Sequence, residues 1–321
     1  MNVVFMGTPD FALPPLRRLA GTPGHRITAV VTRPDRPRGR HHQHTFPPPV
    51  KQLAEELGLR IIQPESVNEQ GTIRTLEGLA PDLIVVVAFG QKLSREFLGI
   101  PRIACINLHA SLLPKYRGAA PIAQAIIDGE KVTGVTAQKV AYEIDTGDVI
   151  DKEVVEIGPD ETAGELERRL AVVAGDLLIR VLDTYEDSTV SCTPQREESA
   201  SYVRRVKKED ALINWNQPAE NIHNFVRGMN PRPGAFAFLP GKGDRPKKRL
   251  IVLRSRVEAK NESREPGRPG TILGTSDQGI QVAAGAGSLW ITRLQPEGGR
   301  EMTAREYLLG HHVVDGECFV S

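Results

Sequence analysis

The sequence predicts an α/β fold, a doubly wound and mostly parallel sheet, followed by a small β-barrel domain. Segments typical of strands and helices alternate through about the first 183 residues, as in doubly wound proteins. Residues 83–88 are apolar without alternation, which is typical of a central parallel strand covered on both faces. After residue 208, short strands separated by glycine-rich turns replace the alternation.

In the first part, Gly7 ends an opening strand and Pro9 lies in the first turn of the following helix, where its missing N–H costs little. Apolar residues at Leu166, Leu170 and Leu177 give a long amphipathic helix. We expect strands at 2–6, 26–31, 60–63, 83–88, 104–108, 134–140 and 149–155, and helices at 9–20, 49–57, 68–79, 120–128 and 162–183.

The pattern then becomes polar, which predicts a catalytic domain at 1–189, a linker at 190–208 and a C-terminal domain at 209–321. In the last part we expect helices at 219–229 and 303–309, and strands at 234–239, 250–257, 270–273, 279–283 and 288–294. The strand pattern alone does not separate a barrel from a sandwich.

Composition restricts the function classes. The net charge of the 321 residues is +1, so any argument for nucleic acid must rest on local basic patches. Three cysteines without metal-ligand or disulfide spacing fit a reducing compartment, and we expect a cytoplasmic protein. No apolar run reaches membrane-spanning length, so we expect no membrane association.

Asn107 and His109 lie two residues apart where a buried strand leaves its sheet, so both side chains should point to one face. Asp145 precedes a Thr-Gly turn that could return a carboxylate to this strand end. An amide and an imidazole can stabilise an oxyanion, and the acid can relay a proton. This set, without a nucleophile, suits direct acyl transfer to an amine. The alternative is that Asn107 caps a turn and His109 is a satisfied core histidine.

The longer string at 107–121, Asn-Leu-His-Ala-Ser-Leu-Leu-Pro-Lys-Tyr-Arg-Gly-Ala-Ala-Pro, resembles the signature of the folate-dependent formyltransferases. The resemblance covers nearly the whole chain, including 6–11, 33–40, 48–51 and 82–90. It is greatest to those members that act on methionyl-tRNA. It implies a Rossmann-like formyltransferase domain and an open barrel of oligonucleotide-binding type.

The resemblance also implies an activity: transfer of formyl from 10-formyltetrahydrofolate to the α-amine of initiator methionyl-tRNA, for translation initiation. Asn107, His109 and Asp145 match the catalytic residues of the superfamily. We expect a monomer and no metal. The folate would lie along three loops, with apolar side chains covering the pterin. The predicted folate-binding residues are Phe89, Gly90, Gln91, Ser111, Leu112, Leu113, Pro114, Tyr142 and Ile144.

Local basic groups are the candidates for tRNA contact through phosphates. The predicted residues are Arg36, Arg38, Arg40, Arg205, Lys207, Lys247 and Lys248. The alternative is that the basic loop at 33–44 is an ordinary solvated surface loop. It departs from the family pattern at His41-His42-Gln43-His44, whose spacing suits no standard closed metal site.

Two further departures keep a second acceptor open. Tyr116 stands where the tRNA enzymes often have Trp, and Ala110 replaces a frequent Gly. Tyr is common in the formyltransferases of sugar nucleotides, so an amino-sugar nucleotide is the alternative acceptor. A non-enzymatic RNA-binding protein is disfavoured, because the Asn, His and Asp set is complete.

Overall fold

The computed structural model describes residues 1–38, 44–241, 247–258 and 267–320, and it divides into two compact units. The first unit comprises Met1–Pro121, Val132–Glu156 and Glu167–Val203. The second unit begins its longest segment at Arg204 and includes two short earlier segments, 122–131 and 157–166. The domain limits expected from the sequence, 1–189 and 209–321, stay a prediction.

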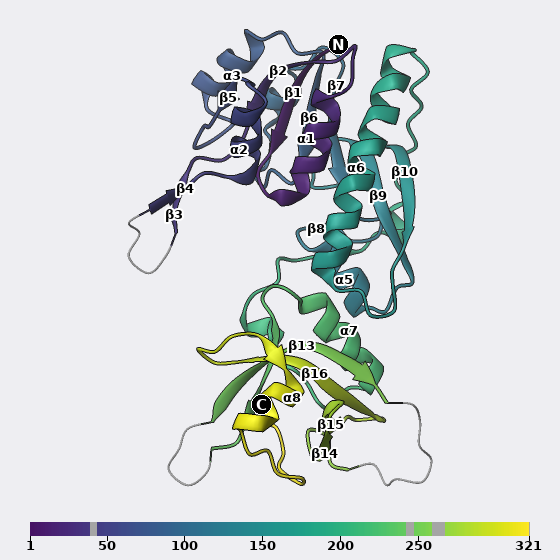
Figure 1. Cartoon of the computed structure of the whole chain (residues 1–321). Helices are drawn as coiled ribbons and strands as arrows, with labels where there is room; N and C mark the ends of the chain where they lie inside the picture. Colours follow the sequence, from purple (N-terminus) through teal and green to yellow (C-terminus); the bar gives the residue numbers. More distant parts are fainter. Residues whose placement is uncertain (39–43, 242–246, 259–266, 321) are drawn as a thin grey trace. The chain divides into compact units, whose positions relative to one another are not determined.

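A mostly parallel sheet forms the centre of the first unit, which confirms the predicted fold class (Figure 1). Its strand order is β10-β9-β7-β6-β1-β2-β5. The strands from β7 to β5 pair in parallel, whereas β9 pairs antiparallel with both of its neighbours, β7 and β10. The bounds are β1 Asn2–Gly7, β2 Arg26–Val31, β5 Ile61–Ile62, β6 Leu83–Val87, β7 Ala104–His109, β9 Val132–Lys139 and β10 Val149–Glu156.

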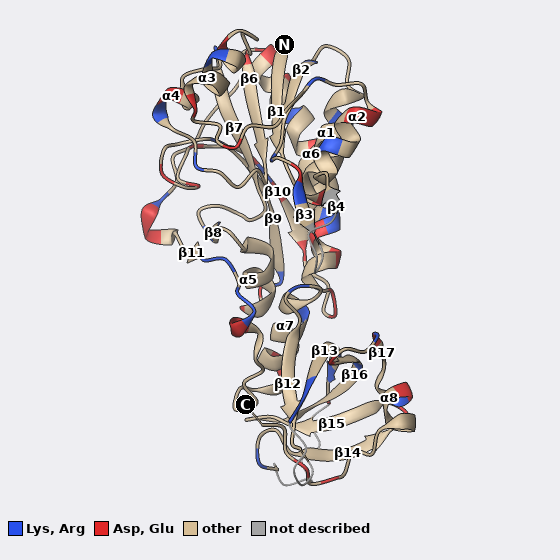
Figure 2. Cartoon of the chain, turned by 90° about the vertical axis from the view of Figure 1, so that its left-hand side faces the viewer, with Lys and Arg blue, Asp and Glu red and all other residues tan. Residues whose placement is uncertain are grey.

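Helices cover both faces of this sheet (Figure 2). One face carries α1 (Leu13–Ala20), α2 (Pro49–Glu56) and α6 (Ala163–Glu186), and the other carries α3 (Gln70–Glu77) and α4 (Arg95–Leu98). Alternate strand residues such as Val4, Met6 and Ile84 pack in one core cluster with Leu76 of α3 and Phe97 of α4. Burial on both faces explains why the sequence of β6 is apolar without alternation. Helix α5 spans Pro121–Ile127.

Several short elements were not predicted. β3 (Arg36–Arg38) and β4 (His44–Phe46) pair as an antiparallel hairpin. β8 (Arg117–Gly118) pairs in parallel with β11 (Tyr202–Val203), far along the chain. The 3-10 helix η2 (Glu197–Ser199) was also not predicted, whereas η1 (Asp10–Ala12) lies within the helix predicted at 9–20. The pairing of β8 with β11 attaches residues that sequence analysis assigned to a linker to the first unit.

The second unit is an antiparallel sheet in the order β12-β13-β16-β15-β14, with β17 paired to β16. Bridges from Phe238 to Val320 and from Thr271 to Cys318 tie the two edges of the sheet to one C-terminal segment, which closes it into a small barrel. The elements are η3 Glu209–Ala211, α7 Ala219–Met229, β12 Ala235–Leu239, β13 Lys248–Val257, β14 Ile272–Ser276, β15 Gly279–Ala283, β16 Ser288–Pro296, β17 Met302–Thr303 and α8 Ala304–Gly310.

Candidate active site

The end of β7 places Asn107 and His109 beside two polar residues of β9. Asn107 pairs in register with Gln138, and His109 pairs with Thr136. Alternate residues of a strand share a face, and residues directly opposite each other across an antiparallel pair share it too. The side chains of Asn107 and Gln138 therefore reach one point in front of the sheet.

That point is the carboxylate of Asp145, which returns to the sheet from the loop after β9. Oδ1 of Asp145 accepts hydrogen bonds from Nδ2 of Asn107 at 3.3 Å and Nε2 of Gln138 at 3.0 Å. Oδ2 accepts one from the backbone N–H of Gly118 at 2.9 Å. Nδ1 of His109 lies 3.5 Å from the same oxygen. The structure thus brings the three predicted catalytic residues together around one acid.

His109 is held on both sides of its ring. His109 is 6% exposed, and its Nε2 lies 2.8 Å from the carbonyl oxygen of Tyr116. Since a carbonyl can only accept, Nε2 must carry a proton in this contact. Nδ1 faces the Asp145 carboxylate, so a ring with protons on both nitrogens satisfies both neighbours. The imidazole is therefore oriented, and one of its two polar neighbours is the Asp145 carboxylate.

Backbone geometry at the site departs from the common regions. Asp145 has φ of +55° and Tyr116 has φ of +62°, both in the left-handed region that side chains rarely adopt. Gly118, at φ +112°, approaches the backbone of Val203 so closely that a Cβ atom would collide with it. Such conformations cost free energy and persist only where their surroundings enforce them. Here they aim a carboxylate and a backbone N–H at each other.

Gln195 forms a second layer behind Asp145, and no sequence pattern pointed to it. Its Nε2 donates to the carbonyl oxygens of Asp145 at 2.8 Å and Gly147 at 2.7 Å, and lies 3.2 Å from Oε1 of Gln138. Its own Oε1 accepts from Nε of Arg117 at 3.1 Å. The turn that carries the acid is therefore tied to residues beyond Thr189.

Arg117 anchors this layer although its side chain is fully buried. Burial opposes its charge, but hydrogen bonds to Glu197 and Tyr202 outweigh burial, and the pKa of Arg117 is raised. The backbone N–H of Arg117 also donates to Ser201 at 2.8 Å. A buried arginine paired in this way fixes the segment from 195 to 202 against the loop that follows β7.

The loop that follows β7 is ordered by internal bonds. Oγ1 of Thr136 donates to the carbonyl of Ser111 at 2.6 Å and accepts from the N–H of Leu113 at 3.1 Å. Lys152 donates to the carbonyl of Leu113, and burial lowers the pKa of this lysine. Leu113 is buried, and the Leu113–Pro114 peptide is cis.

The other predicted folate-binding residues differ in whether their side chains reach the surface. Phe89 is buried in the core cluster of the first unit, and the side chain of Gln91 bonds the backbone of Val67 and Glu65. In contrast, Tyr142 and Ile144 are exposed by 37% and 59%. Gly90, at φ +79°, exposes its backbone, and its carbonyl accepts from Arg33. The loop that carries Asp145 therefore presents exposed apolar side chains.

The predicted tRNA-binding residues lie on the surface wherever the structure describes their side chains. Arg36 is exposed on β3, and the backbone of Arg38 lies on the same strand. Arg40, like His41, His42 and Gln43, lies outside the described residues. The remaining four are exposed in the second unit: Arg205, Lys207, Lys247 and Lys248.

Two further features bear on the chemistry. Burial raises the pKa of the Cys105 thiol to about 12, so this cysteine is no nucleophile at neutral pH. In the described part of the chain, no helix has the length and apolarity needed to cross a bilayer.

Comparison with protein families gives the class. Residues 1–182 match the formyl transferase family, and residues 205–312 match the formyl transferase C-terminal domain. The chain is a member of the formyl transferase family. Methionyl-tRNA formyltransferases are similar along the whole length. The identity is 42% for that of Halothermothrix orenii, with 99% of both chains covered, and 45% for that of Alkaliphilus metalliredigens, covering 98% of this chain and 97% of the relative. Within the family, the chain belongs to the methionyl-tRNA formyltransferases.

Solved structures share the fold at lower identity. A sugar 3N-formyl transferase, WlaRD, solved with dTDP and 5-N-formyl-THF, has a TM-score of 0.65 at 17% identity, covering 90% of this chain and 96% of that one. HypX from Aquifex aeolicus in complex with tetrahydrofolic acid has a TM-score of 0.61 at 18% identity, covering 98% of this chain and 50% of that one. At such identities the likeness shows the fold alone, so it does not favour a sugar acceptor.

Proposed function

We propose that this chain transfers the formyl group of 10-formyltetrahydrofolate to the α-amine of initiator methionyl-tRNA, with Asn107, His109 and Asp145 as its catalytic residues. The observation that carries the proposal is the Asp145 carboxylate, bonded by Asn107, Gln138 and the Gly118 N–H and facing His109. This is a preorganised cluster of donors and one acid at a strand end, with no nucleophile in it.

The oxyanion would be stabilised by groups already in place. A primary amide has two N–H donors, and Asn107 gives one to Asp145. Among the described residues the second N–H has no acceptor, so it can meet the formyl oxygen as negative charge develops on that oxygen. His109 brings a ring whose positive charge, when doubly protonated, lies beside the same region. Donors fixed before reaction cost no reorganisation during it.

Proton transfer completes the reaction. The neutral α-amine attacks the formyl carbon, and a bond from nitrogen to carbon forms. The attacking nitrogen then loses a proton to Asp145 through a water molecule. The bond from the formyl carbon to N10 of the folate breaks, and N10 receives that proton as tetrahydrofolate leaves. Asp145 thus ends in the state in which it began.

Binding of the folate is supported by the exposed apolar side chains of Tyr142 and Ile144, which belong to the loop that carries Asp145. A pterin ring needs apolar cover and a few fixed polar groups at its edge. Backbone groups of residues 89–91 and 111–114 can supply the polar edge. The side chains of Phe89 and Leu113 are buried, and the backbone of Leu113 already bonds Thr136 and Lys152, so the polar edge would come from the other residues of these segments.

Binding of tRNA would use Arg36, Arg38 and Arg40 in the first unit and the exposed basic residues of the second. Each cation that meets a phosphate releases counterions, so affinity should depend strongly on salt. We also propose that the chain acts as a monomer in the cytoplasm, where tRNA is charged with methionine.

The test offers two acceptors side by side with 10-formyltetrahydrofolate: methionyl-tRNA and a dTDP-linked amino sugar. The proposal expects formyl-methionyl-tRNA in the first reaction and no formylated sugar in the second. Formylation of the sugar at a comparable or higher rate would overturn the assignment of the acceptor.

A further inference from the structure

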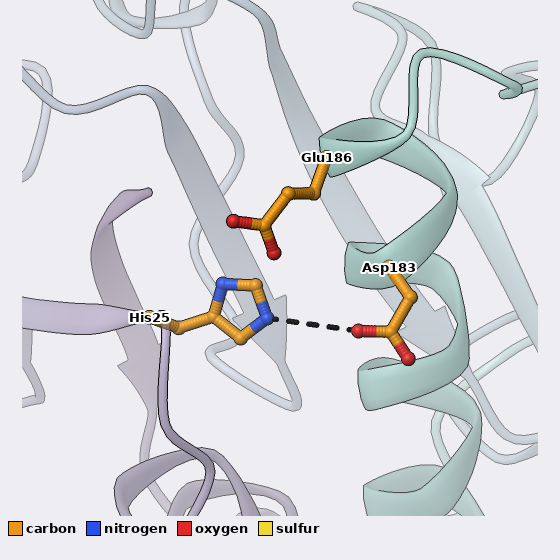
Figure 3. A group of neighbouring side chains, drawn as sticks. All are labelled: His25, Asp183 and Glu186. Atoms are coloured by element: carbon orange, nitrogen blue, oxygen red, sulfur yellow. Dashed lines mark ion pairs between the residues drawn. The ribbon is translucent and has the colours of Figure 1, made fainter.

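A second cluster of ionisable side chains lies in the first unit, away from the proposed active site. His25 comes from the turn before β2, and Asp183 and Glu186 come from the end of α6 (Figure 3). One ligand atom from each of the three lies within 4.8 Å of the others. Asp183 and Glu186 are three residues apart, so both carboxylates fall on one side of the helix and face the histidine.

His25 distinguishes this cluster from an ordinary exposed acidic surface. Its side chain is only 1% exposed, and its Nδ1 is buried without a hydrogen-bond partner. Figure 3 shows the ring between the two carboxylates, with Nε2 directed to Asp183 and the other nitrogen on the side of Glu186. A buried polar atom without a partner is costly, and native proteins rarely keep one without a reason.

The turn that presents His25 is fixed by the backbone. Gly24 has φ of +90°, and its carbonyl accepts from the N-terminal ammonium of Met1 at 2.7 Å. The N–H of Arg26 donates to the carbonyl of Met1 at 2.8 Å. These bonds hold the residues on both sides of His25, so the imidazole is positioned before any ligand arrives.

We propose that His25, Asp183 and Glu186 bind a divalent transition-metal ion of the zinc type. Zinc accepts imidazole nitrogen together with carboxylate oxygen, whereas calcium and magnesium prefer oxygen ligands alone. Three protein ligands leave a fourth position for water, and the exposure of both carboxylates gives access to it.

The distances allow such a site to close. Ligand atoms around a tetrahedral zinc ion lie about 3.3 Å apart, given bonds of about 2.0–2.1 Å. One ligand atom of each residue lies within 4.8 Å of the others, so the separations need to shorten by about 1.5 Å at most. Asp183 and Glu186 are exposed side chains at the helix surface, so rotation about their own bonds can bring the oxygens closer while His25 stays in place.

The role of the ion would be structural. His25 precedes β2, and β2 runs parallel to β7 within one sheet. The start of β2 therefore lies at the amino ends of the parallel strands, whereas Asn107 and His109 lie at their carboxyl ends. The metal would therefore not touch the formyl group. It would join the turn before β2 to the end of α6, and this adds a link between segments far apart in the chain.

The experiment uses the untagged full chain, treated with EDTA and dialysed, and zinc chloride as the probe. Zinc affinity is measured by calorimetry and thermal unfolding by circular dichroism, for the parent, His25→Ala, Glu186→Gln and Asp187→Asn. Zinc at a hundredfold excess over its Kd should raise the Tm of the parent by about 5 °C or more. Magnesium chloride should give no comparable rise.

Asp187→Asn is the matched control, because it removes an exposed acid next to Glu186 that is outside the cluster. It should keep the parental affinity, whereas His25→Ala and Glu186→Gln should weaken zinc binding at least about tenfold. Binding at His41, His42 or His44 is common to all variants and cancels in the comparison. Equal zinc affinity and equal Tm shifts in the parent and Glu186→Gln would overturn the proposal, even if His25→Ala fails to fold.

Discussion

Two buried histidines, one in each unit, have similar exposure and different surroundings. His109 is 6% exposed and His223 is 8% exposed. On α7, Nδ1 of His223 lies 3.1 Å from the Ser255 hydroxyl, and Nε2 lies 3.2 Å from the Pro159 carbonyl and 3.4 Å from Oδ1 of Asp160. His109 lies between a carbonyl and the Asp145 carboxylate, on which three further donors converge. Both histidines face an acid, but the side chain of Asp160 is 76% exposed, whereas that of Asp145 is 12% exposed and is shared with other donors at a strand end, which equips His109 for chemistry.

The largest effect should follow from removing a donor of the first cluster. Asn107→Ala and His109→Ala should each lower kcat roughly 10²-fold or more, because each removes a stabiliser of the oxyanion. The kcat is measured from the formylation of methionyl-tRNA at saturating folate. His312→Ala, which removes an exposed histidine, is the control and should keep parental turnover. Near-parental kcat in a folded His109→Ala variant would remove the distinction between the two histidines.

A smaller loss of kcat should follow from weakening the second layer of hydrogen bonds behind Asp145. Gln195→Ala removes the bonds that hold the Asp145 and Gly147 carbonyls, and misplacement of a catalytic group is costly even at a distance. We expect kcat to fall about tenfold with little change in KM for tRNA. Gln217→Ala, at an exposed glutamine of the second unit, should have no effect. An unchanged kcat in Gln195→Ala would mean that the turn holds the acid without this side chain.

The exposed cations of the second unit should act on binding and not on chemistry. Arg205→Ala with Lys207→Ala should lower kcat/KM for methionyl-tRNA and reduce the slope of its logarithm against log salt by about 1 per residue. The affinity for folate should stay constant. Arg102→Ala, which removes an arginine paired with Asp82 in the first unit, is the control. Superimposable salt curves for the double variant and the parent would exclude these two residues from the phosphate track.

His223 should give the smallest effect, on stability alone. Burial lowers its pKa below the usual 6.5. Because the unfolded chain then binds more protons than the folded one, stability should be lost as pH falls through about 6.5. The chain's two tryptophans, Trp215 and Trp290, both lie in the second unit, so their fluorescence during urea unfolding reports on that unit. His223→Gln should flatten the pH dependence between pH 7 and 5.5, and an unchanged slope would refute the account.

Much of this architecture could be predicted from the sequence because its signals are local. The apolar run of β6 and the helix at Ala219–Met229 follow from residue periodicity within one segment. The pairing of β8 with β11 joins two-residue strands, and no local pattern marks strands so short. For the same reason Gln195 and Arg117 were missed: a polar residue in a polar stretch gains its role only when a distant segment packs against it.

Within the site, Asn107 and His109 could be predicted to share a face because strand geometry fixes alternation. The left-handed backbone at Asp145 could not, since aspartate gives only a weak preference for that region. Gln138 lay in a predicted strand, but its orientation toward the acid depends on the register between β7 and β9. Register across strands far apart in the chain is a tertiary property.

The most direct test of the central claim is the single-turnover rate of formyl transfer to methionyl-tRNA, with both substrates saturating, for the parent, Asp145→Asn and Asp148→Asn. Asp148 lies in the same loop, and its carboxylate makes no hydrogen bond with the described residues that would link it to the cluster. The account predicts a rate roughly 10²-fold lower for Asp145→Asn and a near-parental rate for Asp148→Asn. A parental rate in folded Asp145→Asn would contradict it.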